Sequence, residues 1–245
     1  MPMTLRLRAD RLLVERGLFE SRAKAQAAIA AGRVTADDVP VRRASDAIAR
    51  DAVLRAEPAH PWVSRGGVKL EAALERFGFD PRGRVCLDVG ASTGGFTEVL
   101  LAREARRVYA VDVGRDQLHP SLRARAEIVV FEDTDIRALD PVRLAEPPDF
   151  VTIDVSFISL KLVLPPALAL ARLPAPLVAL IKPQFEASRR HLKKGIVRDP
   201  AVQAQVCGEI SDAVHALGWT VIDVIESPIA GGDGNREFLL GGTRG

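Results

Sequence analysis

The segment VCLDVGASTGGFTEVLLA, residues 85–102, constrains the fold of this 245-residue chain more than any other part of it. An apolar run is followed by a glycine-rich turn and then by a helical pattern, which predicts a buried strand, a tight loop and a helix. Gly90 allows the chain to reverse after the strand, while Gly94 and Gly95 allow the backbone to approach a ligand at the N-terminus of the helix. The segment therefore predicts an α/β sheet that holds a ligand at the end of a strand.

Strand and helix patterns alternate through the rest of the chain. Strand patterns cover residues 84–89, 107–113, 127–131, 149–155, 176–182, 219–227 and 237–242. Helix patterns begin at Gly95, near Gln117, at Leu160 and at Pro200, where Asp199 is the expected N-cap. This alternation predicts the α/β class, with a doubly wound, mostly parallel sheet covered by helices on both faces.

The first 58 residues have a different pattern, which indicates a small α+β domain. A short helical pattern ends at Gly17, and a second one runs from an N-cap at Ser21 to a stop at Gly32. Short strands are expected over residues 33–41, around a turn, and over residues 51–57. The prolines of EPAHPWV indicate a linker. We therefore expect domains at residues 1–58 and 66–245, joined by a linker over residues 59–65.

The charge of the chain is divided unevenly between these parts. The first sixty residues carry 11 Lys and Arg against 8 Asp and Glu, and the remainder carries 23 against 24. A basic front piece indicates a polyanionic partner. Arg22, Lys24 and Arg33 place cations along its second helix and the following strand. A solvated helix face is the other interpretation of these charges.

Composition and hydropathy exclude several classes of protein. With 47% hydrophobic and 27% charged residues, the chain is typical of a soluble globular protein. Cys86 and Cys207 fit neither a disulfide framework nor a metal site, and the charged start MPMTLRLRADRLL lacks the apolar stretch of a signal peptide. Residues 162–181 are long enough to span a membrane, but four prolines and Arg172 favour a buried helix followed by a buried strand. We therefore expect a cytoplasmic protein without a membrane segment or a bound metal.

The glycine-rich loop narrows the choice of ligand without completing it. A dinucleotide fingerprint has a glycine where this chain has Ser92. Asp112 ends the next strand, 24 residues after Asp88, where an acidic side chain accepts hydrogen bonds from ribose hydroxyls. The loop thus predicts an adenosine-containing ligand. It favours S-adenosylmethionine over NAD, although both stay open at this point.

Five motifs in order, DVGASTGGFTEVL, IDVSFISL, IKPQFE, GIVRDP and GNREF, resemble the TlyA family of ribosomal RNA 2′-O-methyltransferases. The catalytic domain of that family is related to the FtsJ-type RNA methyltransferases, and the first 58 residues resemble the S4-type RNA-binding domain. The resemblance implies a seven-stranded Rossmann-like methyltransferase sheet behind a small RNA-binding domain. It also implies a monomeric enzyme that transfers a methyl group from S-adenosylmethionine to a cytidine ribose 2′-hydroxyl in 16S and/or 23S ribosomal RNA, free or in ribosomal subunits.

The resemblance also assigns residues to roles. Its Lys-Asp-Lys-Glu catalytic set corresponds to Lys69, Asp154, Lys182 and Glu237. The cofactor contacts that the resemblance and the loop spacing imply are Asp88, Gly90, Ser92, Thr93, Gly94, Gly95 and Phe96 around the methionine part, Asp112 at the ribose and Asp135 at the adenine edge. RNA contacts are expected at Arg6, Arg22, Lys24, Arg33, Arg65, Arg189, Arg190, Lys193 and Lys194. For the last four of these, a mobile solvated loop is the other interpretation.

The residue types of the catalytic set agree with this chemistry. A ribose hydroxyl is a poor nucleophile until its proton is removed or strongly hydrogen-bonded, and a lysine can accept a proton only when its pKa falls well below the free value of about 10.4. Asp154 and Lys182 lie at the carboxyl ends of predicted parallel strands, where open α/β sheets hold their ligands. Lys69 has no acidic partner at helical spacing in its own helix. We therefore expect Lys182 to accept the proton, tuned by Lys69, with Asp154 and Glu237 positioning both amines.

Some positions depart from the family pattern, and three other functions stay open. Asp37 and Asp38 replace an Asn-Gly or Asp-Gly hairpin turn, Glu104 replaces a glycine at a helix end, and Asp133 replaces an arginine. The alternatives are a non-catalytic RNA-binding protein with a retained methyltransferase fold, a pore-forming haemolysin and an NAD enzyme. They are disfavoured in turn by the intact catalytic set, by the lack of a signal or clean span, and by Ser92.

Overall fold

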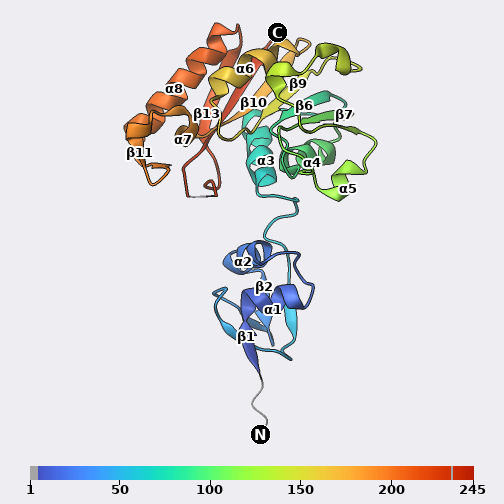
Figure 1. Ribbon diagram of the computed structural model, residues 1–245, viewed down its shortest axis with the longest axis vertical. Helices are drawn as coiled ribbons and strands as arrows, with labels where there is room; N and C mark the ends of the chain where they lie inside the picture. The colour runs from blue at the N-terminus through green and yellow to red at the C-terminus, as the bar shows by residue number, and fades with distance from the viewer. Residues whose placement is uncertain (1–4, 233) are drawn as a thin grey trace. The chain divides into compact units, whose positions relative to one another are not determined.

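A computed structural model describes residues 5–232 and 234–245 of the chain. Residues 1–4, where the predicted RNA-binding domain begins, lie outside the described residues, as does residue 233. The chain divides into two compact units, one ending at Pro61 and the other covering Trp62–Gly245 (Figure 1). Each unit has a hydrophobic core of its own.

The larger unit is built on a seven-stranded sheet (Figure 1). Its strands are β6 (Val85–Val89), β7 (Arg107–Val111), β8 (Ile128–Phe131), β9 (Phe150–Ile153), β10 (Ala175–Ile181), β13 (Thr220–Glu226) and β14 (Phe238–Arg244). The order across the sheet is β13-β14-β10-β9-β6-β7-β8. Neighbours from β10 to β8 are parallel, and β14 is antiparallel to both β10 and β13. The predicted seven-stranded, mostly parallel sheet is confirmed.

Helices cover both faces of this sheet. The principal ones are α3 (Gly66–Phe77), α4 (Gly95–Ala102), α6 (Leu160–Ala169) and α8 (Pro200–Ala216). On β6, Cys86 belongs to the core cluster with α3 and α4, whereas Val85 and Leu87 belong to the cluster with α6 and α8. This alternation is the two-residue period of a strand that is buried on both faces. The parallel strands are thus shielded from water, and ligands are held at their carboxyl ends.

Residues 162–181, which have the length of a membrane span, divide between a helix and a strand. α6 ends at Ala169 and contains Pro165 and Pro166, and β10 begins at Ala175. β10 lies between β9 and β14 and is buried along its whole length. Within residues 5–232 and 234–245, no helix combines the length and the apolar character that a membrane crossing requires.

The helix expected near Gln117 is shorter than its pattern indicates, because α5 covers only Pro120–Arg123. The residues before it are held instead by the carboxylate of Glu132, which accepts hydrogen bonds from the backbone N–H groups of residues 116–118 at 2.8–2.9 Å. Arg123 adds an ion pair at 2.7 Å. Arg123 and these backbone donors lower the pKa of Glu132 to about 2. A carboxylate at the end of β8 therefore replaces helical hydrogen bonds in this segment.

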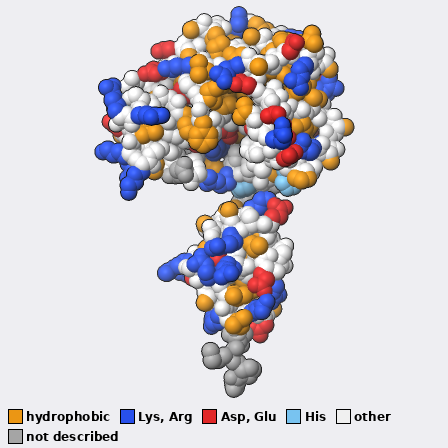
Figure 2. Space-filling model, viewed as in Figure 1, with side chains coloured by type: hydrophobic (Ala, Val, Ile, Leu, Met, Phe, Trp, Pro, Cys, Tyr) orange, Lys and Arg blue, Asp and Glu red, His pale blue; other side chains and the backbone are white. Residues whose placement is uncertain are grey.

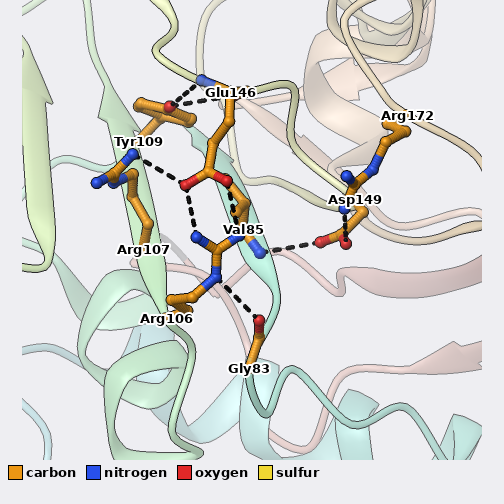
Figure 3. Close-up of polar contacts among 8 residues, drawn as sticks. All are labelled: Gly83, Val85, Arg106, Arg107, Tyr109, Glu146, Asp149 and Arg172. Atoms are coloured by element: carbon orange, nitrogen blue, oxygen red, sulfur yellow. Dashed lines mark hydrogen bonds and ion pairs between the residues drawn. The ribbon is translucent and has the colours of Figure 1, made fainter.

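A polar cluster joins the amino ends of three parallel strands, away from their carboxyl ends (Figure 3). Arg106 is the residue just before β7, and Glu146 accepts hydrogen bonds from both of its terminal nitrogens at 2.7 and 2.8 Å. Asp149, just before β9, accepts one from the backbone N–H of Val85 on β6 at 2.9 Å. Arg172 binds the other oxygen of Asp149 at 2.8 Å. The cluster therefore fixes the starts of β6, β7 and β9 relative to one another.

The smaller unit, over residues 5–61, combines helices with two small antiparallel sheets. Its elements are β1 (Arg6–Arg8), α1 (Ala9–Glu15), α2 (Arg22–Ala30), β2 (Val34–Ala36), β3 (Val39–Pro40), β4 (Ala47–Ala49) and β5 (Leu54–Ala56). β1 pairs with β4, and the second sheet has the order β3-β2-β5. Ser21 caps α2 as predicted, since its hydroxyl accepts a hydrogen bond from the Lys24 backbone at 3.3 Å. β1 and β4 were not predicted from the sequence.

Left-handed backbone conformations explain how the departures from the family pattern are accommodated. Asp37 and Asp38 have φ angles of 49° and 63°, as a two-residue type I′ turn requires at both positions. Aspartate tolerates this region better than most non-glycine residues, and Asp37 accepts a hydrogen bond from the backbone N–H of Val53 at 2.9 Å. Glu104 and Asp133 have φ angles of 63° and 54°. The aspartate pair therefore preserves the hairpin while adding negative charge to it.

A buried aspartate organises the cations of the smaller unit. Asp10, on α1, is fully buried, and its carboxylate accepts hydrogen bonds at 2.7–3.2 Å. The donors are Arg8, Arg22 and Gln26. The Arg8 guanidinium, followed by Arg22 and Gln26, holds the pKa of Asp10 far below its usual range. Arg22, expected to contact RNA, therefore also joins α2 to α1.

Replacement of Asp10 by asparagine should destabilise the smaller unit by about 1.5–3 kcal/mol, the usual contribution of hydrogen bonds to a charged group. Folding lowers this carboxyl pKa, so the stabilisation is present above the unfolded value of about 3.9 and is lost as the pH falls toward the folded value. Amide protection factors of α1 and α2 in the full chain, measured from about pH 2 to pH 7, test both effects. Asp10→Asn should lower protection at neutral pH and match the wild type in acid. Asp51→Asn, at an exposed position, is the control, and unchanged protection in Asp10→Asn at pH 7 would contradict the prediction.

Candidate active site

A pocket opens at the carboxyl ends of β6, β9 and β10. Its lining comes from the glycine-rich loop with the start of α4 (Gly90, Ala91, Ser92, Thr93, Gly95, Phe96), from α3 and the residues before it (Ser64, Arg65, Gly66, Lys69), and from the segments after β9 and β10 (Asp154, Ser156, Lys182). This is the edge where open parallel sheets hold ligands. The pocket therefore lies beside the loop from which a ligand site was predicted.

The glycines of the loop allow close contacts between backbone segments. Gly90 has φ 85°, and an added Cβ would lie 2.3 Å from the backbone oxygen of Asp154. A Cβ on Gly95 would lie 2.2 Å from Ser64 Oγ, and one on Gly94 would lie 2.3 Å from the side chain of Leu122. Gly94 does not line the pocket, whereas Gly90 and Gly95 do. The loop therefore requires these glycines in order to pack against neighbouring segments, apart from any need to approach a ligand.

Asp88 faces the protein interior rather than the pocket. It is fully buried on β6, and its carboxylate accepts hydrogen bonds from Thr97 Oγ1 at 2.6 Å and Thr152 Oγ1 at 3.1 Å. Burial raises the pKa of Asp88 to about 7. Because Thr97 is on α4 and Thr152 is on β9, Asp88 joins three elements behind the glycine-rich loop.

The two acidic residues expected at the adenosine lie beyond the pocket lining. Asp112 follows β7 and accepts hydrogen bonds from the backbone N–H groups of Ser92 at 2.8 Å and Gly114 at 2.7 Å. Asp135 caps the short helix η1 (Ile136–Ala138) and forms an ion pair with Arg137 at 2.6 Å, which lowers the pKa of Asp135. Directly after Asp112, Val113 is 70% exposed. Sequence reasoning did not single out this apolar side chain.

The four residues of the predicted catalytic set form two ion pairs. Lys69 Nζ lies 2.5 Å from Glu237 Oε2, and Lys182 Nζ lies 2.7 Å from Asp154 Oδ1. Lys69, Lys182 and Glu237 are all buried, at 3–9% exposure. Lys69, Asp154 and Lys182 line the pocket. The lysine without a partner in its own helix is therefore paired with a carboxylate 168 positions further along the chain.

Sheet topology explains why residues so distant in sequence meet. In the antiparallel pair of β10 with β14, Ile181 is opposite Phe238, so the adjacent residues Lys182 and Glu237 emerge at the same edge. Asp154 follows β9, the other neighbour of β10. α3 packs on β14 at Gly241, where an added Cβ would lie 2.6 Å from the ring of Phe77. This packing directs the first turn of α3 toward the same edge.

Ser156 and Phe157, which follow Asp154 closely in the chain, were not anticipated from the sequence. The hydroxyl of Ser156 accepts a hydrogen bond from Lys182 Nζ at 2.9 Å, and Ser156 lines the pocket. Phe157 is 90% exposed with φ 64°, and its ring centroid lies 5.0 Å from that of Phe185. A bulky residue in the left-handed region is unusual, and an exposed one beside a pocket indicates a functional position. Neither residue has a spacing signal that a single sequence could reveal.

The residues expected to contact RNA differ in their location and in the contacts that they make. In the smaller unit, Arg6 donates to the backbone oxygen of Ala47 at 2.9 Å, and Lys24 and Arg33 pair with Glu20 and Glu57. In the larger unit, Arg65 lines the pocket. The remaining four, Arg189, Arg190, Lys193 and Lys194, lie on η3 (Arg189–His191) and on the hairpin of β11 (Leu192–Lys193) and β12 (Ile196–Val197). Figure 2 shows Lys and Arg side chains projecting at the edge of the larger unit where Figure 1 places β11.

Together, the fold and the site define a Rossmann-like methyltransferase. The sheet has an antiparallel strand, β14, inserted beside β10, and its pocket combines a glycine-rich loop with two Lys–carboxylate pairs. Residues 62–244 match the FtsJ-like methyltransferase family, and residues 7–54 match the S4 domain.

Similar proteins identify the family more closely. YqxC from Bacillus subtilis (strain 168) is 46% identical over 237 residues, which cover 95% of this chain and 84% of that protein. The 16S/23S rRNA (cytidine-2′-O)-methyltransferase TlyA from Mycobacterium tuberculosis (strain ATCC 25618 / H37Rv) is 43% identical over 241 residues, covering 97% of this chain and 90% of that one. A solved hemolysin-like structure from Streptococcus thermophilus has a TM-score of 0.77 at 37% identity, covering 99% of this chain and 90% of the other. The chain belongs to the TlyA family, in which an S4 domain precedes an FtsJ-like methyltransferase domain.

Proposed function

We propose that this protein transfers the methyl group of S-adenosylmethionine to the 2′-hydroxyl of a cytidine in 16S and/or 23S ribosomal RNA. The observation that carries the proposal is the pair of buried Lys–carboxylate contacts at one pocket of a methyltransferase sheet. The relative TlyA from Mycobacterium tuberculosis, 43% identical, is a 16S/23S rRNA (cytidine-2′-O)-methyltransferase. Methyl transfer to a hydroxyl group needs alignment and a proton acceptor, and the two Lys–carboxylate pairs support both.

The pocket residues fit S-adenosylmethionine. Gly90 lines the pocket without a side chain of its own, and Ser92, Thr93 and Phe96 line the wall beside it. We assign the methionine part to these four residues. Asp112 is assigned to the ribose, with the adenine between Val113 and Asp135. When bound, the cofactor supplies an electrophilic methyl group on its sulfonium.

The positions of Asp88 and Gly94 favour a role in holding the glycine-rich loop rather than in contacting the cofactor. Asp88 holds the start of α4 from inside the protein through Thr97, and Gly94 gives α4 its left-handed N-cap, with φ 99°. Neither residue faces the pocket. We therefore assign both to positioning the loop, while Gly95 keeps its backbone on the pocket wall.

Lys182 is placed to accept the proton of the ribose hydroxyl. A neutral amine has two N–H groups and one lone pair. Lys182 Nζ donates a hydrogen bond to Ser156 Oγ at 2.9 Å and forms an ion pair with Asp154 Oδ1 at 2.7 Å, and these two contacts hold the amine, with its lone pair available in the neutral form, at the pocket that Lys182 lines. Lys69, held by Glu237, presents a second amine to the same pocket. These contacts hold the proton acceptor in one orientation while the hydroxyl oxygen attacks the methyl group.

The surroundings of the pocket suit RNA. Phe157 offers an exposed aromatic ring, and unpaired bases stack on such rings in RNA recognition. Arg65 on the wall can bind a phosphate near the target nucleotide. We assign residues 1–58 to RNA binding and residues 66–245 to catalysis, joined by residues 59–65, in a monomeric enzyme that acts in the cytoplasm.

Methyl transfer by the purified protein tests the proposal. Ribosomal subunits from a strain lacking the enzyme are incubated with S-adenosylmethionine carrying a labelled methyl group, and digested RNA is analysed by mass spectrometry. We expect the label on the ribose of a cytidine, at one position per methylated RNA. If neither subunit and neither naked RNA accepts the label, the catalytic proposal is wrong and the non-catalytic RNA-binding alternative is favoured. The other enzyme class to be tested is an NAD enzyme. Calorimetric titration with S-adenosylmethionine and with NAD shows which of the two cofactors the protein binds.

A further inference from the structure

The cationic hairpin of β11 and β12 has a defined conformation. Leu192 pairs with Val197 and Lys193 pairs with Ile196. Between them, Lys194 and Gly195 have φ angles of 53° and 78°, which is the signature of a two-residue type I′ turn. Lys193 and Lys194 are exposed at this turn. Strands of two residues have little stability alone, so other contacts must hold the hairpin in place.

Those contacts come from a buried asparagine. Asn235 is 1% exposed, and both ends of its amide bind the hairpin backbone. Its Oδ1 accepts a hydrogen bond from the N–H of Val197 at 3.2 Å, and its Nδ2 donates one to the oxygen of Gly195 at 3.1 Å. Gln203, on α8, adds a third contact by donating to the oxygen of Val197 at 2.8 Å. Two buried amides therefore anchor the turn that carries Lys193 and Lys194.

The same asparagine is fixed to the catalytic carboxylate. It lies two residues before Glu237 in the motif GNREF, and its backbone oxygen accepts a hydrogen bond from Gly231 N at 2.9 Å. Gly231 in turn packs on Glu237, where an added Cβ would lie 2.4 Å from Oε1. The backbone oxygen of Glu237 accepts a further hydrogen bond from Ser227 N at 2.9 Å. The anchor of the hairpin and the partner of Lys69 are thus parts of one short, tightly bonded segment.

We propose that Asn235 is a positioning residue that holds the Lys193–Lys194 turn as a phosphate-binding element at a fixed place relative to Glu237. The ligand of the turn is the RNA backbone near the target nucleotide, because a phosphate is the group that two adjacent exposed ammonium groups bind without sequence preference. This inference rests on the proposed function. Binding of the RNA strand to the turn and alignment of its ribose at the Lys69–Glu237 pair are then mechanically linked through one side chain.

A double-mutant cycle on the full-length protein tests the link. Lys193→Ala/Lys194→Ala should raise the KM for the methylated ribosomal subunit, leave kcat near the wild-type value and reduce the salt slope of binding by about 1.4 to 1.8, for two lost phosphate contacts. Asn235→Ala should raise the KM and reduce the salt slope equally. It should also lower kcat by about 10- to 100-fold, as a misplaced catalytic group does. The triple variant should have the KM of Asn235→Ala alone.

Controls separate this inference from folding and from the proposed function. Gln205→Ala removes an exposed amide from α8 and should change neither constant. Gln203→Ala removes only the third contact and should shift KM in the same direction by less, which provides a readout if Asn235→Ala fails to fold. Calorimetric affinity for S-adenosylmethionine should stay at the wild-type level in every variant. KM increases that multiply in the triple variant, or a wild-type kcat in Asn235→Ala, would overturn the inference, whereas an inactive wild-type protein would overturn the proposed function itself.

Discussion

Lys182→Ala is expected to lower kcat for methyl transfer by about 10²- to 10⁴-fold, the usual contribution of a positioned proton acceptor. The loss follows because no other amine of the site contacts both Asp154 and Ser156 among the described residues. Single-turnover measurements with saturating S-adenosylmethionine and ribosomal subunits report the chemical step directly. Calorimetry should show that the cofactor still binds, since the glycine-rich loop is untouched.

Two further variants identify the role of the amine. Lys182→Arg places a permanent positive charge at this position but cannot accept a proton at neutral pH, so we expect it to be as inactive as the alanine variant. Lys161→Ala removes a surface lysine that pairs with Glu209 and should be as active as the wild type. A Lys182→Arg enzyme with substantial activity would show that the charge matters and that proton transfer to Lys182 does not.

Lys69→Met is expected to remove activity and to destabilise the larger unit by about 3–5 kcal/mol. The reason is that Glu237, 3% exposed, would keep a buried charge without its partner at 2.5 Å. Lys69→Met combined with Glu237→Leu removes both charges and should recover most of the stability, because buried ion pairs are often replaced by apolar residues at little cost. The double variant should nevertheless stay inactive.

Urea unfolding followed together with methyl transfer distinguishes these outcomes. Stability that recovers without activity shows that the pair is retained for catalysis rather than for folding. Arg76→Met, which removes the exposed pair with Asp223 at 3.0 Å, is the matched control and should change stability by less than about 1 kcal/mol. Wild-type stability in Lys69→Met, or activity in the double variant, would contradict the prediction.

Local signals were sufficient for most of the fold. The caps at Ser21 and Asp199 form as predicted, because a cap depends on a hydroxyl or carboxylate and the next few N–H groups. The sequence predicts strand β10 despite four nearby prolines, because a strand that is buried on both faces is apolar throughout. The conformation of the segment before α5 could not be predicted from its own sequence, because the carboxylate of Glu132, which follows β8, determines it.

The candidate site shows the same division. Motifs in one sequence were sufficient to propose Lys69, Asp154, Lys182 and Glu237 as a set, but not to pair them. Asp88 was assigned to the cofactor from its place beside the glycine-rich loop, whereas its side chain points to Thr97 and Thr152 inside the protein. The orientation of a single side chain depends on contacts from other elements, which sequence spacing does not contain.

The sequence by itself determined the strand and helix order, the glycine-rich loop, the family and the identity of the four candidate catalytic residues, because each depends on local pattern or on motif. The tertiary structure decided which lysine meets which carboxylate. It did so by placing β14 antiparallel beside β10, which brings Glu237 to the edge where Lys182 emerges, and by packing α3 on β14, which brings Lys69 to Glu237. Such pairings join residues up to 168 positions apart, and only the sheet topology specifies them.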